Sequence, residues 1–172
     1  MSAFDPAPII VTALFGREDQ AWFDALRREH FPPERNHLAA HLTLFHNLPP
    51  SAAAEVKQRL AGETRGVTAP EARLAAPISL GRGVAYRIDS PGLVAIRAAV
   101  ADAFTGLLTP QDQVGWRAHV TVQNKVEPTV ARALLADLSR DFHARPLRIT
   151  GLASWWYRGG PWEPLSRHMF AA

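Results

Sequence analysis

A four-residue pattern, His-apolar-Thr-apolar, occurs twice in this chain, as HLTL at 41–44 and as HVTV at 119–122. The second histidine follows the first after 78 positions, and other structural markers coincide at the same offset. They are Pro50 with Pro128, Val56 with Leu134, Leu60 with Leu138, and the turn glycines Gly81 with Gly159. Self-similarity at a fixed spacing indicates that one supersecondary unit is used more than once. The sequence therefore predicts a fold of two similar halves.

The elements expected around the two patterns also recur in order: strand, helix, His-containing strand, helix, hairpin strand. Alternating or clustered β-branched residues indicate strands, and a period of three to four between proline and glycine boundaries indicates helices. The expected strands are 8–15, 40–47, 72–80, 83–89, 116–124, 146–157 and 162–170. The expected helices are 17–30, 51–62 with Gly62 near its end, 92–108 closed by Pro110, and 128–141.

We expect one bilobal domain over 1–172, with an α+β fold. Its two pseudo-symmetric lobes would each be an antiparallel sheet packed on helices, and a central cleft would carry the two His-containing strands. The chain is 47% hydrophobic, which is enough for a core of this size.

Composition narrows the chemistry. With no cysteine, disulfides, thiolate metal sites and cysteine nucleophiles are excluded, and a reducing cytoplasm is the simplest location. The apolar runs are too short to span a membrane, and MSAFDPAPII lacks the features of a secretion signal. A net charge of +3 with abundant arginine is compatible with an anionic ligand. We expect a monomer.

The repeated pattern places imidazole and hydroxyl groups on one face of each strand, because successive side chains point to opposite faces. Two histidines facing one site can share acid and base roles, since imidazole titrates near neutral pH. Threonine hydroxyls can donate hydrogen bonds to phosphate oxygens. The pattern indicates in-line displacement at a phosphodiester, with no metal and no cofactor. The residues expected on the polar face are His41 and Thr43, and in the second strand Arg117, His119, Thr121, Gln123 and Lys125.

The two motifs resemble the paired His-x-Thr-x motifs of the 2H phosphoesterase superfamily, and HVTVQNKV at 119–126 is similar to its 2′-5′ RNA ligase branch. The resemblance implies a bilobal fold and metal-independent opening of 2′,3′-cyclic phosphates to 2′-phosphates, with joining or cleavage of 2′-5′ linkages as a further activity. It also implies that His41 and His119 are the acid and base, and that Thr43 and Thr121 bind phosphate. The first motif departs from the commonest pattern, because Phe45 stands where an arginine is frequent.

Other features leave alternatives open. Tyr86, Arg87, Trp116 and Tyr157 are further candidates for contact with an RNA end or a cyclic nucleotide, the aromatic ones by stacking on a base. His37, His41 and His46 could suggest a metal site. Their irregular spacing, however, does not align metal ligands in a segment that enters a strand. A non-catalytic module that holds an RNA end, or an enzyme for a small non-RNA phosphodiester, also fits the pattern. The sequence does not distinguish acid from base.

Overall fold

The computed structural model describes residues 7–172. The N-terminal segment, for which the sequence predicts no secretion signal, lies largely outside the described residues. The strands are β1 (Ile9–Phe15), β2 (Leu42–Leu48), β3 (Glu71–Ser79), β4 (Val84–Asp89), β5 (His119–Gln123), β6 (Arg145–Trp156) and β7 (Glu163–Met169). The α-helices are α1 (Arg17–His30), α2 (Ala53–Thr64), α3 (Pro91–Ala103), α4 (Pro110–Gln113) and α5 (Pro128–Arg140).

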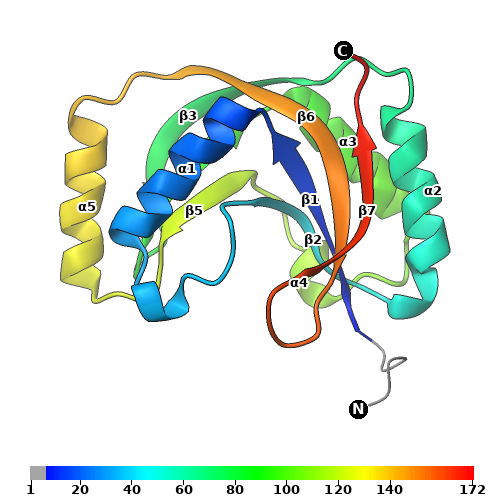
Figure 1. The fold of residues 1–172 in the computed structure, drawn as a ribbon, viewed down its shortest axis with the longest axis horizontal. Helices are drawn as coiled ribbons and strands as arrows, with labels where there is room; N and C mark the ends of the chain where they lie inside the picture. The colour runs from blue at the N-terminus through cyan, green and yellow to red at the C-terminus, as the bar shows by residue number, and fades with distance from the viewer. Residues whose placement is uncertain (1–6) are drawn as a thin grey trace.

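All seven strands pair in antiparallel fashion, in the order β2-β1-β6-β3-β4-β5, with β7 on β6. The long strand β6 is shared between the two halves. Its first residues, Arg145–Arg148, pair with β3, and its remainder, from Ile149 to Trp156, pairs with β1. The two halves are therefore joined through one continuous strand (Figure 1).

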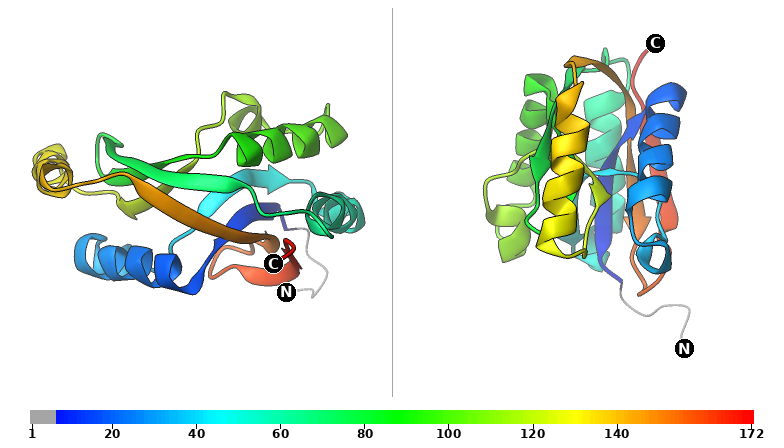
Figure 2. Two further views of the ribbon diagram at one scale, coloured as in Figure 1. Left: turned by 90° about the horizontal axis from the view of Figure 1, so that it is seen from above. Right: turned by 90° about the vertical axis from the view of Figure 1, so that its left-hand side faces the viewer.

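The predicted repeat is confirmed in the order of elements. The first half runs β1-α1-β2-α2-β3, and the second runs β4-α3-β5-α5-β6 with the short helix α4 inserted between α3 and β5. The helices lie around the outside of the sheet, with α1 and α5 at one end and α2 and α3 at the other (Figures 1 and 2). The paired glycines Gly81 and Gly159 have φ of 82° and 87°, a left-handed conformation that glycine adopts without steric cost.

The two His-containing strands, β2 and β5, lie at opposite ends of the strand order, yet they contact each other. Trp116 Nε1, just before β5, donates a hydrogen bond to the backbone carbonyl of Thr43 in β2, at 2.9 Å. This contact brings together two motifs that are distant in sequence.

Two predicted boundaries are wrong. The helix expected over 92–108 ends at Ala103, because Phe104 leaves the helical conformation and Gly106 has a φ of 85°. Pro110 does not close that helix but begins α4, since proline at a first helical position lacks only an N–H that would be unpaired anyway. The prediction that Gly62 lies near the end of its helix is confirmed, because α2 ends at Thr64.

No helix within residues 7–172 combines the length and apolar character needed to cross a membrane.

Candidate active site

The two motif histidines are held in the same way. His41 directly precedes β2, and its Nδ1 lies 2.9 Å from the carbonyl oxygen of Ala39. His119 opens β5, and its Nδ1 lies 2.8 Å from the carbonyl oxygen of Arg117. A carbonyl only accepts hydrogen bonds, so each Nδ1 carries the proton and each Nε2 is left to accept a proton or, once charged, to donate one.

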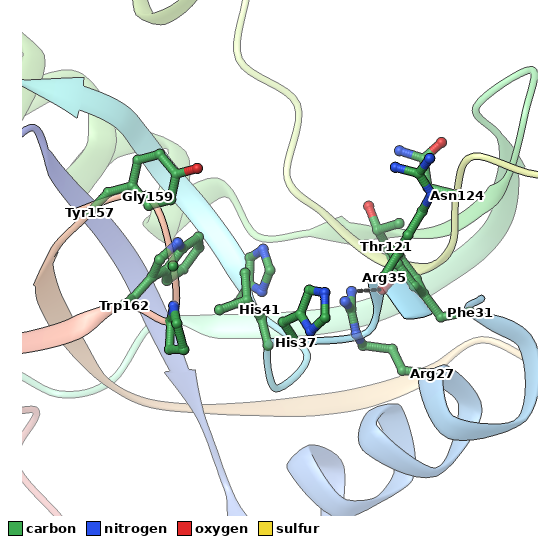
Figure 3. A pocket seen from close by; sticks show the side chains of 13 residues that line it. Arg27, Phe31, Arg35, His37, His41, Thr121, Asn124, Tyr157, Gly159 and Trp162 are labelled. Atoms are coloured by element: carbon green, nitrogen blue, oxygen red, sulfur yellow. Dashed lines mark hydrogen bonds between the residues drawn. The ribbon is translucent and has the colours of Figure 1, made fainter. Parts of the chain in front are cut away.

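A cavity of about 600 Å³, here called the main cavity, joins the two motifs. His41 comes from the first motif and Thr121 from the second, so both halves of the fold contribute to its wall. In Figure 3, Tyr157 and Trp162 of the β6–β7 hairpin lie on one side of His41, and Arg27, Thr121 and Asn124 lie on the other. The Trp162 ring is 4.6 Å from the His41 ring, centroid to centroid. Exposed Arg35 and His37 complete the polar wall.

The surroundings of His41 favour its neutral form. Burial is the largest cause and lowers its pKa to about 4, although the hydrogen bond to the Ala39 carbonyl acts in the opposite direction. The positive charges of Arg27, His46 and His119 lower the pKa further. His41 is therefore neutral near pH 7, with an Nε2 that can accept a proton. His119 is not among the residues that line the main cavity, although its charge acts on His41.

Arg27 is a functional candidate that the sequence analysis missed. The sequence marks it only as one of the basic residues that favour the end of helix 17–30, yet it is 4% exposed and lines the main cavity. Its Nη1 donates to the Thr121 carbonyl at 3.1 Å, and its Nε donates to Asn36 Oδ1 at 3.1 Å. The available signal was its position four residues after buried Phe23, which places both on one helix face.

Thr43 is half-buried and does not line the main cavity. Its carbonyl is used by Trp116, and its Cα pairs with Thr12 of β1. Of the two motif threonines, Thr121 is thus the one that the structure places on the cavity wall.

The expectation that Tyr86 contacts substrate is wrong. Its side chain is 2% exposed, and its ring packs against those of Trp22, Phe23 and Phe142. In register, Tyr86 pairs with Val120, so it points to the apolar face of the sheet and not to the face of His119.

The expectation for Gln123 is wrong for a different reason. Alternation in β5 is interrupted by a register shift opposite Val84 and Ala85, and Gln123 is 4% exposed. Its buried Oε1 has no hydrogen-bond partner. A β-bulge redirects side chains in this way, and the alternating pattern cannot reveal it.

The remaining predicted contacts are dispersed. Arg87, Trp116 and Arg117 line a second cavity, of about 860 Å³, beside α3. Arg87 also forms an ion pair with Asp89 at 3.2 Å. Lys125 is exposed in the turn after β5, where its φ is 61°, and it lines neither of these two cavities. Tyr157, 43% exposed, does line the main cavity.

The three histidines weighed as a metal site do not form one. His46 Nδ1 instead lies 3.3 Å from Asp112 Oδ1. Within residues 7–172, no group of three His, Asp or Glu side chains is placed to hold a metal ion.

Several solved structures share this fold. Escherichia coli LigT complexed with 3′-AMP superimposes with a TM-score of 0.57 and 18% identity, covering 98% of this chain and 100% of that one. The protein TT0787 of Thermus thermophilus gives a TM-score of 0.63 and 13% identity, with coverage of 95% and 97%. A structure described as a phosphoesterase gives a TM-score of 0.57 and 18% identity, with coverage of 97% and 100%.

The family follows from the sequence as well. The model of the 2′-5′ RNA ligase superfamily matches residues 15–161, and the protein belongs to that superfamily. No curated protein matches the sequence significantly.

Proposed function

We propose that this protein is a metal-independent phosphodiesterase that opens 2′,3′-cyclic phosphates of RNA ends or nucleotides to 2′-phosphates. The observation that carries the proposal is the main cavity, which joins His41 of one motif to Thr121 of the other. Identical anchoring of both imidazoles through Nδ1 supports it, because this leaves two Nε2 atoms for proton transfer.

The chemistry needs one base and one acid. Neutral His41 takes a proton from water as the water oxygen attacks phosphorus, and the P–O3′ bond breaks. His119, as the imidazolium, gives its Nε2 proton to the departing O3′. The ring opens with net addition of one water, and a 2′-phosphate remains. We assign the base role to His41 because its surroundings keep it neutral.

Thr121, on the wall of the main cavity, supplies a contact to phosphate in this proposal. Its hydroxyl group donates to a non-bridging oxygen, where negative charge gathers in the transition state. With a 5′-hydroxyl in place of water as the nucleophile, the same step joins two RNA ends through a 2′-5′ linkage, and the reverse of that step cleaves the linkage and re-forms the cyclic phosphate.

The polarity of the main cavity suits a nucleotide. Trp162 and Tyr157 offer aromatic surface on one side, and Arg27 and Arg35 offer positive charge on the other. A volume of about 600 Å³ lies within the range of small-ligand sites. Structures of Escherichia coli LigT complexed with 3′-AMP, NADP+ and ATP support nucleotide binding on this fold.

The test is to incubate the protein with 2′,3′-cyclic nucleotides in the presence of a chelator and to identify the product by phosphorus NMR. We expect the 2′-phosphate, at an undiminished rate in chelator. Binding without any ring-opened product would instead favour a non-catalytic module that holds RNA ends or nucleotides. Loss of activity in chelator, with recovery on adding a divalent metal, would contradict the metal-independent mechanism.

A further inference from the structure

Arg27 is a buried cation without a carboxylate partner. Within residues 7–172, none of the ion pairs includes it. The acid that acts on it electrostatically is Asp24, but Asp24 Oδ1 already accepts hydrogen bonds from the Ala40 N–H, at 2.7 Å, and from Gln20 Nε2, at 3.1 Å. Burial of an unpaired charge is costly, so such a group usually meets an anion from elsewhere.

The guanidinium is fixed in one position. Its Nε and Nη1 are held by Asn36 and the Thr121 carbonyl, and its central carbon lies 4.1 Å above the centre of the Phe31 ring. These contacts leave Nη2 with no acceptor among the described residues, on a side chain that lines the main cavity. Rigid placement of an unused donor toward a cavity is the arrangement that oxyanion recognition requires.

Arg27 also lies between the two motifs. It contacts the backbone of Thr121 directly, and its charge acts on His41. Any phosphate that His41 and Thr121 both reach is therefore close to the guanidinium. The other arginine of the cavity wall, Arg35, is exposed and lacks this fixed position.

We propose that Arg27 binds an anionic oxygen of the substrate phosphate. The cation of the site then comes from helix α1 and not from either His-containing strand. The identity of the phosphate as the reacting one rests on the proposed function, but the anion site itself does not.

The first test uses inorganic phosphate as the probe and compares the wild type with Arg27→Gln. We expect the Kd for phosphate to rise about 10- to 100-fold, as for loss of a hydrogen bond to a charged group. Arg28→Gln is the matched control, because Arg28 is the next residue on the helix and is exposed. Its phosphate affinity should equal that of the wild type.

Two further measurements distinguish phosphate binding by Arg27 from a role of Arg27 in folding alone. In Arg27→Ala, added guanidinium ion should restore part of the phosphate affinity, which a purely structural loss would not allow. In the wild type, the side-chain N–H signals of Arg27 should shift with phosphate along the same binding curve. This second measurement decides the matter even if the variants fail to fold.

The proposal is overturned if phosphate does not bind the wild type, or if it saturates the site without moving the Arg27 signals. It is also overturned if folded Arg27→Gln binds phosphate as the wild type does. Phosphate binding that depends on Arg27, without turnover of any cyclic nucleotide, would leave the anion site standing and remove the enzymatic proposal. Turnover of a cyclic nucleotide with unchanged kcat/KM in Arg27→Gln would leave the enzymatic proposal standing and remove the anion site.

Discussion

At the first motif, the burial of His41 links activity to pH. A base must be neutral to accept a proton, so kcat/KM should fall as pH drops through about 4, the pKa of this imidazole. A bound phosphate adds negative charge nearby and raises that pKa, so the acid limb of kcat should lie at higher pH than that of kcat/KM. A pH–rate profile from about pH 3.5 to 8 measures the acid limb of kcat and the acid limb of kcat/KM. An acid limb of kcat/KM near the ordinary histidine value of about 6.5 would contradict the assignment of His41 as the base.

The same shift affects stability. The pKa of His41 is lower in the folded protein than in the unfolded chain, so the unfolded state binds more protons between about pH 4 and 6.5. Stability should therefore be lost as pH falls across this window. A His41→Gln variant has no imidazole to titrate at this position, so its free energy of unfolding should fall less than that of the wild type across the same pH window.

At the scale of single residues, the sequence predicted those features that depend on the two-residue alternation along a strand. Alternation along a strand placed His41 with Thr43 and His119 with Thr121, because that pattern needs only local geometry. Arg27 could not be assigned a function in this way, since its role depends on Thr121, which is 94 positions away. Tyr86 was misjudged because which face of a strand meets the helices depends on tertiary packing.

At the scale of elements, each half of the fold donates a side-chain hydrogen bond to the His-containing strand of the other half. Arg27 in α1 donates to the carbonyl of Thr121 in β5, and Arg97 in α3 donates to the carbonyl of Leu44 in β2, at 3.2 Å. Arg97 also donates to the carbonyl of Asp112 in α4, at 2.6 Å. The two motifs are thus held by cross-contacts that the repeat alone did not predict.

The short helix α4 fixes β2 through Asp112, which is 1% exposed. Its carboxylate accepts hydrogen bonds from the backbone N–H groups of His46 and Asn47, at 2.8 and 2.9 Å. Burial pushes the pKa of Asp112 up, but its hydrogen bonds with His46 and Asn47 outweigh burial, and the pKa is lowered. The stability that Asp112 contributes should be present above its ordinary pKa and be lost as pH falls below it.

Asp112→Asn should lower the free energy of unfolding by about 1.5–3 kcal/mol at pH 7, because charge-assisted hydrogen bonds are replaced by weaker ones. Urea unfolding measures the change. Asp102→Asn is the control, since Asp102 is exposed and its hydrogen bonds, outside those of helix α3, go to its backbone carbonyl and not to its carboxylate. Equal midpoints for Asp112→Asn and the wild type would show that this contact does not hold β2.

At the scale of the whole molecule, the shared strand β6 makes the halves depend on each other. The repeat predicted two lobes, and the order of elements confirms the duplication. The sequence did not predict that one strand pairs with both β1 and β3, because long-range register leaves no trace in local periodicity. The 12 residues of β6 form the strand that pairs with both β1 and β3.

Gly151 tests this dependence. A Cβ at this position would lie 2.5 Å from the His168 carbonyl oxygen, so Gly151→Ala should cost about 1–3 kcal/mol of stability through overpacking. Hydrogen exchange should show β5 losing protection together with β1. Gly160→Ala, where no atom lies within 4 Å, is the control. If β1 is destabilised while β5 keeps its full protection, the halves are independent.

The central claim is that His41 and His119 act together on one phosphorus atom. Its most direct test is the rate of 2′,3′-cyclic nucleotide opening by His41→Ala, His119→Ala and the double variant, with exposed His143→Ala as the control. Each single variant should lose about 10²–10⁴-fold in kcat, and the double variant should lose little more, because groups that act as a unit are not additive. Full activity in either folded single variant, or losses that multiply in the double variant, would contradict the claim.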